Sequence, residues 1–121
     1  MEISVQARGF SLTKALRDHA ERRLRFALGW ADARLHRISV RLSDDNGPRG
    51  GEDKRCRIRI AFAGAPSVVI EDIETDVYAA LDRAADRASR SLARKLERLR
   101  DQRRRLSPPS ASIESLVWAW R

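Results

Sequence analysis

The segment from Thr75 to Arg105 constrains the fold most strongly, because its apolar residues recur at steps of three and four. This spacing gathers apolar side chains on one side of an α-helix. The apolar row is Val77, Leu81, Ala84, Ala85, Ala88, Leu92, Leu96 and Leu99, and a second row, turned well away from it, is Arg83, Arg87, Arg90, Arg94 and Arg98. The segment is therefore predicted to be one long helix with one face toward a core and a basic face toward solvent.

Most of the net charge lies on this helix. Residues 81–105 contain ten Lys and Arg against four acids, which is +6 of the chain's +8. The acids Asp82, Asp86 and Glu97 fall mostly on one flank, so we expect the arginine row to be open to an anion. A basic rod of this kind suits a polyanion such as nucleic acid. The alternative is a solvated face that only keeps the protein soluble.

The rest of the chain contains one more helix and four strands. Period-two alternation predicts strands over residues 2–8, 36–42, 55–62 and 68–73, and three-to-four spacing predicts a helix over 13–28. Ser11 or Thr13 would cap that helix, and Gly29 would end it. His36 is expected on the inward face of its strand with Ile38. The segments 43–53 and 63–66 are predicted to be a loop and a hairpin turn.

The resulting fold class is α+β. The order β-α-β-β-β-α predicts a two-layer sandwich in which a four-stranded sheet carries two helices on one face. The domain covers residues 1–105, and residues 106–121 form a tail. The opposite sheet face would be either a second nucleic-acid surface or a guard against aggregation. This sheet face carries Arg37, Arg41, Arg55, Arg57 and Arg59. The exposed side of the first helix carries a smaller basic cluster of Arg17, Arg22, Arg23 and Arg25.

No pattern for catalysis or metal binding is found in the sequence. Cys56 is the only cysteine, so an intramolecular disulfide and a cysteine-based zinc site are excluded. His19 and His36 lie on different elements, without acids at ligand spacing. We therefore expect no enzyme activity, cofactor, metal or small-molecule substrate. The absence of a signal peptide and of a long apolar segment predicts a cytoplasmic protein without a membrane partner.

The tail begins with a Ser-Pro-Pro-Ser sequence that cannot continue a helix. It ends in an apolar stretch that contains Trp118 and Trp120. Such a segment is either flexible, or folded on its own domain, or a docking segment for another protein.

Several segments together resemble one known family. They are residues 3–8 (ISVQAR), 12–16 (LTKAL), 46–56 (NGPRGGEDKRC) and 76–82 (DVYAALD), followed by the arginine-rich remainder. In this order they resemble the ribosome hibernation-promoting factors, also called ribosome-associated inhibitor A, Y proteins or sigma-54 modulation proteins. The resemblance covers residues 1 to about 103. Long family members carry a C-terminal domain that pairs ribosomes, and at this length we expect the chain not to pair ribosomes alone. The tail matches nothing in the family.

The resemblance implies a non-enzymatic protein that binds the small ribosomal subunit and its ribosomal RNA under stress or in stationary phase. It would occupy the channel for messenger and transfer RNA, block initiation and protect idle ribosomes. By position, the implied RNA contacts are Arg87, Arg90 and Arg94, extended by Arg83 and Arg98, with Arg22 and Arg25 of the first helix and, more weakly, Lys54 and Arg55.

Two other functions stay open at this point. A free-standing double-stranded RNA-binding module would share the two helices on one sheet face and would bind any A-form duplex. A protein-interaction regulator, such as a modulator of a transcription factor, would act through the tail or the exposed sheet.

Overall fold

The computed structural model describes residues 1–44, 54–62 and 66–106. It has the predicted order of strands and helices, with a short 3-10 helix added after the first helix. The elements are β1 (Glu2–Arg8), α1 (Lys14–Leu28), η1 (Gly29–Arg34), β2 (Leu35–Asp44), β3 (Lys54–Phe62), β4 (Val68–Glu74) and α2 (Val77–Leu106). The predicted loop 43–53, turn 63–66 and tail 106–121 lie mostly outside the described residues.

The four strands form one sheet in the order β1-β2-β3-β4. β1 and β2 are parallel, and α1 provides the crossover that such a pair requires. β2, β3 and β4 follow as an antiparallel meander. One cross-strand row, Val5, Val40, Ile58 and Ile70, runs across the whole sheet. This apolar row confirms the alternation that the sequence predicts.

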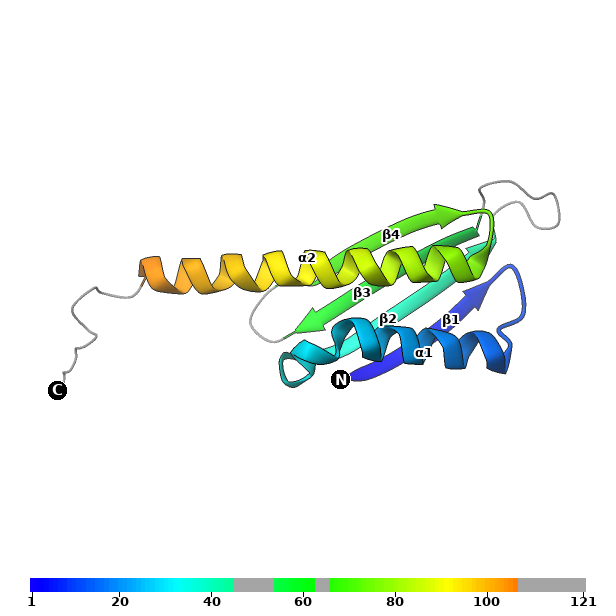
Figure 1. The fold of residues 1–121 in the computed structure, drawn as a ribbon, viewed down its shortest axis with the longest axis horizontal. Coiled ribbons are helices and arrows are strands. Elements are labelled where there is room, and N and C mark those ends of the chain that lie inside the picture. Colours follow the sequence, from blue (N-terminus) through cyan, green and yellow to red (C-terminus); the bar gives the residue numbers. More distant parts are fainter. Residues whose placement is uncertain (45–53, 63–65, 107–121) are drawn as a thin grey trace. The chain divides into compact units, whose positions relative to one another are not determined.

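The core lies between this sheet face and the helices. The chain divides into two compact units, Met1–Ser91 and Leu92–Arg121. In the first unit, α1 and the part of α2 from Val77 to Ser91 lie on the same face of the sheet (Figure 1). The helical residues of this unit with no exposed surface are all alanine or leucine: Ala20, Leu24, Leu28, Ala80, Leu81, Ala84, Ala85 and Ala88. The two-layer α+β sandwich is therefore confirmed.

The start of β2 differs from the prediction. The pairing of β2 with β3 shifts register between Leu35 and Arg37. Leu35, opposite Phe62, is consequently the buried residue, and His36 is exposed. Its predicted inward orientation is wrong, because strict alternation does not hold across such an irregularity.

Polar contacts define the helix ends. Thr13 is the N-cap of α1, and its side-chain hydroxyl accepts a hydrogen bond from Leu16 N at 3.1 Å. Gly29 is the C-cap, after which the chain continues as η1. α2 begins at Val77, and the carbonyl of Asp76 accepts a hydrogen bond from Ala80 N at 2.9 Å. In the second unit, Leu92 is buried and Leu96 and Leu99 are half-buried.

Candidate nucleic-acid interface

Two arginines of the predicted basic row are held by acids of β4. Arg87 Nη1 lies 3.1 Å from Asp72 Oδ2 and donates to the carbonyl of Glu71 at 2.8 Å. Arg83 forms an ion pair with Glu74. The expectation that the whole row is open to an anion is therefore wrong. Asp72 and Glu74 belong to another strand, so the helical periodicity of α2 gave no indication of these pairs.

The flanking acids of α2 instead bind side chains of α1. Asp82 Oδ1 lies 2.9 Å from His19 Nε2 and 3.5 Å from Arg23 Nε, and Asp86 pairs with the guanidinium of Arg23. Arg23 is thus a contact between the two helices, and its side chain is only 22% exposed. Its predicted place on the exposed side of α1 is wrong, because α2 packs beside that side chain.

Four of the predicted contact residues are exposed and unpaired among the residues that the structure describes. In the first unit these are Arg22, Arg25 and Arg90, and in the second unit Arg98. Arg94, also in the second unit, is exposed. Guanidinium groups of this kind can form bidentate hydrogen bonds with phosphate.

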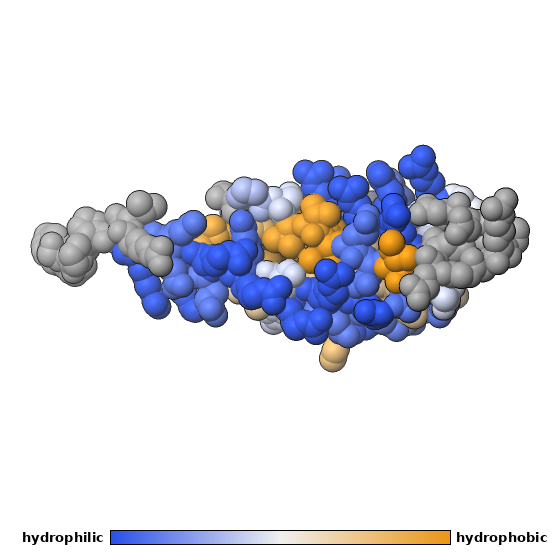
Figure 2. Space-filling model, turned by 90° about the horizontal axis from the view of Figure 1, so that it is seen from above, coloured by the Kyte–Doolittle hydropathy of each residue, from blue (hydrophilic) through white to orange (hydrophobic). Residues whose placement is uncertain are grey.

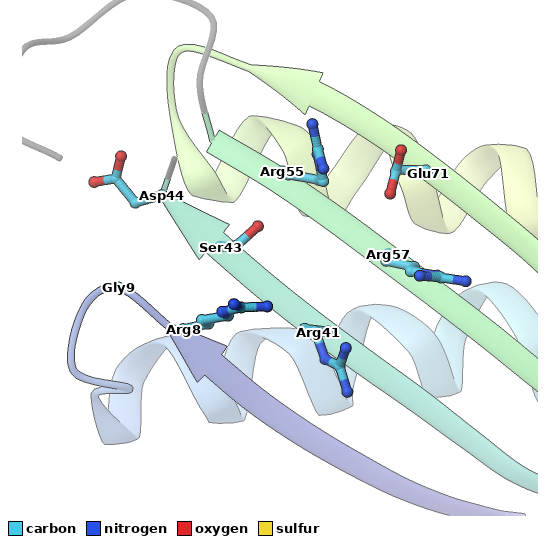
Figure 3. Close-up of a pocket in the computed structure, with 8 residues that line it drawn as sticks. All are labelled: Arg8, Gly9, Arg41, Ser43, Asp44, Arg55, Arg57 and Glu71. Atoms are coloured by element: carbon cyan, nitrogen blue, oxygen red, sulfur yellow. The ribbon is translucent and has the colours of Figure 1, made fainter. Parts of the chain in front are cut away.

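Lys54 and Arg55 lie at the end of the sheet rather than on the helices. Lys54 Nζ lies 3.1 Å from Asp44 Oδ1, and its side chain is 20% exposed. Arg55 belongs to the open face of the sheet, beside Arg8 and Arg57 (Figure 3). The structure therefore does not bring these two residues together with the helical arginines of the first unit.

Two exposed aromatic side chains near the end of α1 were not singled out from the sequence. Phe26 is 85% exposed and Trp30 is 56% exposed. Trp30 Nε1 donates to Ala27 O at 2.9 Å and to Ser89 Oγ at 3.2 Å, which ties η1 to α2. A signal for Phe26 was present, since it lies outside the apolar spacing of α1. Exposed rings beside arginines are suited to stacking on unpaired bases.

Tyr78, near the start of α2, packs against a side chain of α1. Its ring meets that of His19 edge-on, with centroids 5.0 Å apart. Tyr78 is half-buried. This position fits an aromatic residue at the edge of the core.

Cys56 is buried on the inner face of β3. Burial, with a smaller contribution from the neighbouring carboxylate of Asp72, raises the pKa of the Cys56 thiol to about 12. The neutral thiol therefore behaves as a small apolar side chain and is a poor nucleophile. Within residues 1–44, 54–62 and 66–106, no cluster of three His, Cys, Asp or Glu residues is arranged to hold a metal.

The open face of the sheet carries the other concentration of basic side chains. Arg8, Arg41, Arg55 and Arg57 project from three adjacent strands on the side away from the helices (Figure 3). Arg37 and Arg59 belong to the same face, where Arg37 forms an ion pair with Glu2 at 3.0 Å.

None of the described helices is long and apolar enough to span a membrane.

Fold and charge together define a class of protein: a small two-layer α+β domain with arginines on both its helical layer and its open sheet face. The chain belongs to the family described as sigma 54 modulation protein / S30EA ribosomal protein, whose model matches residues 3–100.

Solved structures share this fold. The Protein Y N-terminal domain of Thermus thermophilus is 30% identical, with a TM-score of 0.64 over 78% of this chain and 98% of that one. A ribosomal subunit interface protein from Coxiella burnetii is 15% identical, with a TM-score of 0.70 over 80% and 99%. No curated protein sequence matches the chain.

Proposed function

We propose that this protein is a non-enzymatic, ribosome-associated inhibitor of translation that acts in the cytoplasm. It binds the small ribosomal subunit and its ribosomal RNA, occupies the channel for messenger and transfer RNA, and stabilises idle ribosomes under stress or in stationary phase. Family membership and the similarity to Protein Y support this role. The single structural observation that carries it is that four of the predicted contact residues on the described helices are exposed and unpaired: Arg22, Arg25, Arg90 and Arg98.

Electrostatic attraction would supply most of the binding free energy. Each arginine that neutralises a phosphate releases condensed counterions, so the affinity falls steeply with salt. Structured RNA is recognised largely through its shape and backbone, so a base-specific motif is not required. Bidentate hydrogen bonds from arginine to phosphate would fix the orientation of the bound domain.

The predicted contact residues then divide into three groups. Arg22, Arg25, Arg90, Arg94 and Arg98 are exposed and are proposed to contact RNA directly. Arg83 and Arg87 are engaged by Glu74 and Asp72, so we assign them first to holding α2 on β4. Lys54 and Arg55 would contribute from the sheet.

Co-sedimentation with purified small subunits across a salt series tests the proposal. The variant Arg22→Gln/Arg25→Gln/Arg90→Gln should bind about 10- to 100-fold more weakly at about 0.1 M salt, with a salt slope shallower by roughly 2. The variant Lys14→Gln/Arg17→Gln/Arg34→Gln removes the same charge from exposed positions outside the proposed set. It should stay within a few-fold of wild type.

Competition distinguishes occlusion from the other functions. Messenger RNA with initiator transfer RNA should displace the protein from the subunit. Equal affinity for any A-form duplex would instead indicate a double-stranded RNA-binding module. Unchanged binding by the helix variant, with loss on deletion of residues 107–121, would favour a protein-interaction regulator.

A further inference from the structure

The open face of the sheet has an unusual arrangement of like charges. In the strand register, Arg41 of β2 lies directly opposite Arg57 of β3, and Ser39 lies opposite Arg59. Neighbouring strands are about 4.8 Å apart, and alternate residues of one strand about 6.8 Å apart. Like charges in such positions repel and destabilise a sheet. Because these arginines lower the stability of the sheet, a binding role would explain their presence.

The acids on the described part of this face form no ion pair with the arginine cluster of Arg8, Arg41, Arg57 and Arg59. In the described part of the chain, Arg8, Arg41, Arg57 and Arg59 form no ion pair. Glu2 is engaged by Arg37, and Asp44 by Lys54. Glu71 lies opposite Arg57 in the register but forms no ion pair with it. The cluster therefore offers several unsatisfied guanidinium groups to an external anion.

Protection against aggregation explains this cluster poorly. Charges that prevent strand pairing belong on edge strands, and lysine is the usual choice. Arg41, Arg57 and Arg59 lie instead on β2 and β3, the two central strands. Their hydrogen-bonding edges are already occupied on both sides.

The shape of the face also favours an anionic ligand. Two shallow hollows, of about 380 and 350 Å³, adjoin each other and share Arg41 and Arg57. Figure 3 shows the first hollow, with side chains of all four strands around it, among them Glu71 of β4. Each hollow has room for a phosphate group, and their shared wall is basic. Successive phosphates of one nucleic-acid strand could occupy both.

Apolar side chains on β4 lie beside the arginines of β3. Val69 and Ile73 are 46% and 39% exposed and lie opposite Arg59 and Arg55 in the register. Seen from the β4 side, the molecule shows a hydrophobic patch surrounded by hydrophilic side chains (Figure 2). A single strand of RNA has the complementary pattern, with charged phosphates on one side and apolar base faces on the other. A duplex shows mainly its backbone and hides its base faces.

We infer that the open face of the sheet is a second RNA-binding surface, which takes a single strand with its phosphates on Arg8, Arg41, Arg57 and Arg59 and its bases toward Val69 and Ile73. The carboxylate of Glu71 would accept a hydrogen bond from a base N–H group, such as N3–H of uracil. The choice of RNA as the ligand rests on the proposed function. The domain then holds RNA on both of its layers and can bridge two RNA segments.

Fluorescence anisotropy with a labelled oligouridylate of about 12 nucleotides tests the inference on the full chain. The sheet variant Arg41→Gln/Arg57→Gln/Arg59→Gln should bind about 10- to 100-fold more weakly, with a salt slope shallower by about 2. The helix variant Arg22→Gln/Arg25→Gln/Arg90→Gln has the same net charge and should retain most of the affinity. Val69→Ser should weaken oligouridylate binding but leave the binding of a duplex of equal length unchanged.

Several outcomes would overturn the inference. They are wild-type affinity in the sheet variant, equal losses in the sheet and helix variants, and displacement of the oligonucleotide by polyglutamate at matched charge concentration. Circular dichroism and urea unfolding should show the sheet variant folded and at least as stable as wild type, because its substitutions remove like-charge neighbours.

Small-subunit co-sedimentation of the same variants separates the two proposals. Loss of subunit binding in the helix variant, with unchanged oligouridylate binding by the sheet variant, would sink the inference and leave the proposed function standing. Subunit binding that no variant alters would count against the proposed function.

Discussion

Arg87 of α2 and Asp72 of β4 form an ion pair across the two layers of the domain, with 3.1 Å between Nη1 and Oδ2. Asp72 lies on the inner face of the sheet, and its side chain is only 9% exposed. Arg87 also donates to the backbone carbonyl of Glu71. A residue for which the family resemblance implied an RNA contact therefore fastens the long helix to an edge strand.

Replacing Arg87 by Ala should lower the free energy of unfolding by about 1–3 kcal/mol. The substitution leaves the buried carboxylate of Asp72 without its cation. Because the Arg87 side chain is 47% exposed, solvent screens part of this loss, and the value should stay below that of a fully buried pair. Urea unfolding at neutral pH measures the difference.

Arg90→Ala is the matched control for this substitution. Arg90 lies one turn further along α2, is exposed and has no partner among the described residues. Its removal should change the free energy of unfolding by no more than about 0.5 kcal/mol. Equal losses in the two variants would show that the Asp72 contact contributes nothing specific.

The stability of the protein should fall at alkaline pH through Cys56. The folded state holds the thiol pKa at about 12, against an ordinary value of 9.0. Above pH 9.0 the unfolded chain loses the thiol proton and the folded protein keeps it, so each further pH unit costs up to about 1.4 kcal/mol until about pH 12. Below pH 9.0 this contribution is constant.

The measurement is urea unfolding of wild type and Cys56→Ala at several alkaline pH values. Other titrating groups are common to both proteins and cancel in the difference between their unfolding free energies. That difference should shift against the wild type as the pH rises above 9.0. Parallel pH curves would mean that the thiol is not desolvated.

Two glycines should respond in opposite directions to replacement by alanine. Gly9 has a φ of +88°, and a Cβ atom there would lie 3.0 Å from the carbonyl oxygen of Asp44. Gly9→Ala should therefore destabilise the fold by about 1–3 kcal/mol. Gly29 has a φ of −61° and open space around a Cβ position, so Gly29→Ala should stabilise by about 0.4–1 kcal/mol. Thermal unfolding of the two variants would refute this account if their midpoints moved together.

Phe26 should matter for binding and not for folding. Because Phe26 is 85% exposed, Phe26→Ala should change the free energy of unfolding by no more than about 0.5 kcal/mol. Under the proposed function, loss of a stacking ring should weaken small-subunit binding by about 1–3 kcal/mol. Leu24→Ala, at a fully buried position of the same helix, should instead cost about 2–5 kcal/mol of stability. Unchanged subunit affinity in Phe26→Ala would exclude stacking at this position.

Local periodicity predicted the fold well because it determines which face of each element is buried. The spacing of Leu81, Ala84 and Ala88 predicted the buried side of α2, and the alternation of Ile58 and Ile60 predicted the buried side of β3. One exception is His36, where a register shift interrupts the alternation. Register irregularities depend on the partner strand, so one strand's own sequence does not show them.

The candidate site was harder to predict, because charge pairing depends on contacts between distant parts of the chain. The sequence shows that Arg83, Arg87 and Arg90 share a side of the helix. It does not show that β4 presents acids to the first two and none to Arg90. Which residues of this protein contact the ribosome therefore stays a prediction, and the helix variant tests it.

Because Arg41 and Arg57 lie opposite each other on neighbouring strands, their like charges should repel in the free domain. Added salt screens this repulsion and also weakens the binding of phosphate. It should therefore raise the free energy of unfolding of the free domain and lower its affinity for RNA. A bound polyanion would neutralise the same arginines. Its binding should therefore raise the melting temperature of the domain most at low salt, where the repulsion between the arginines is greatest.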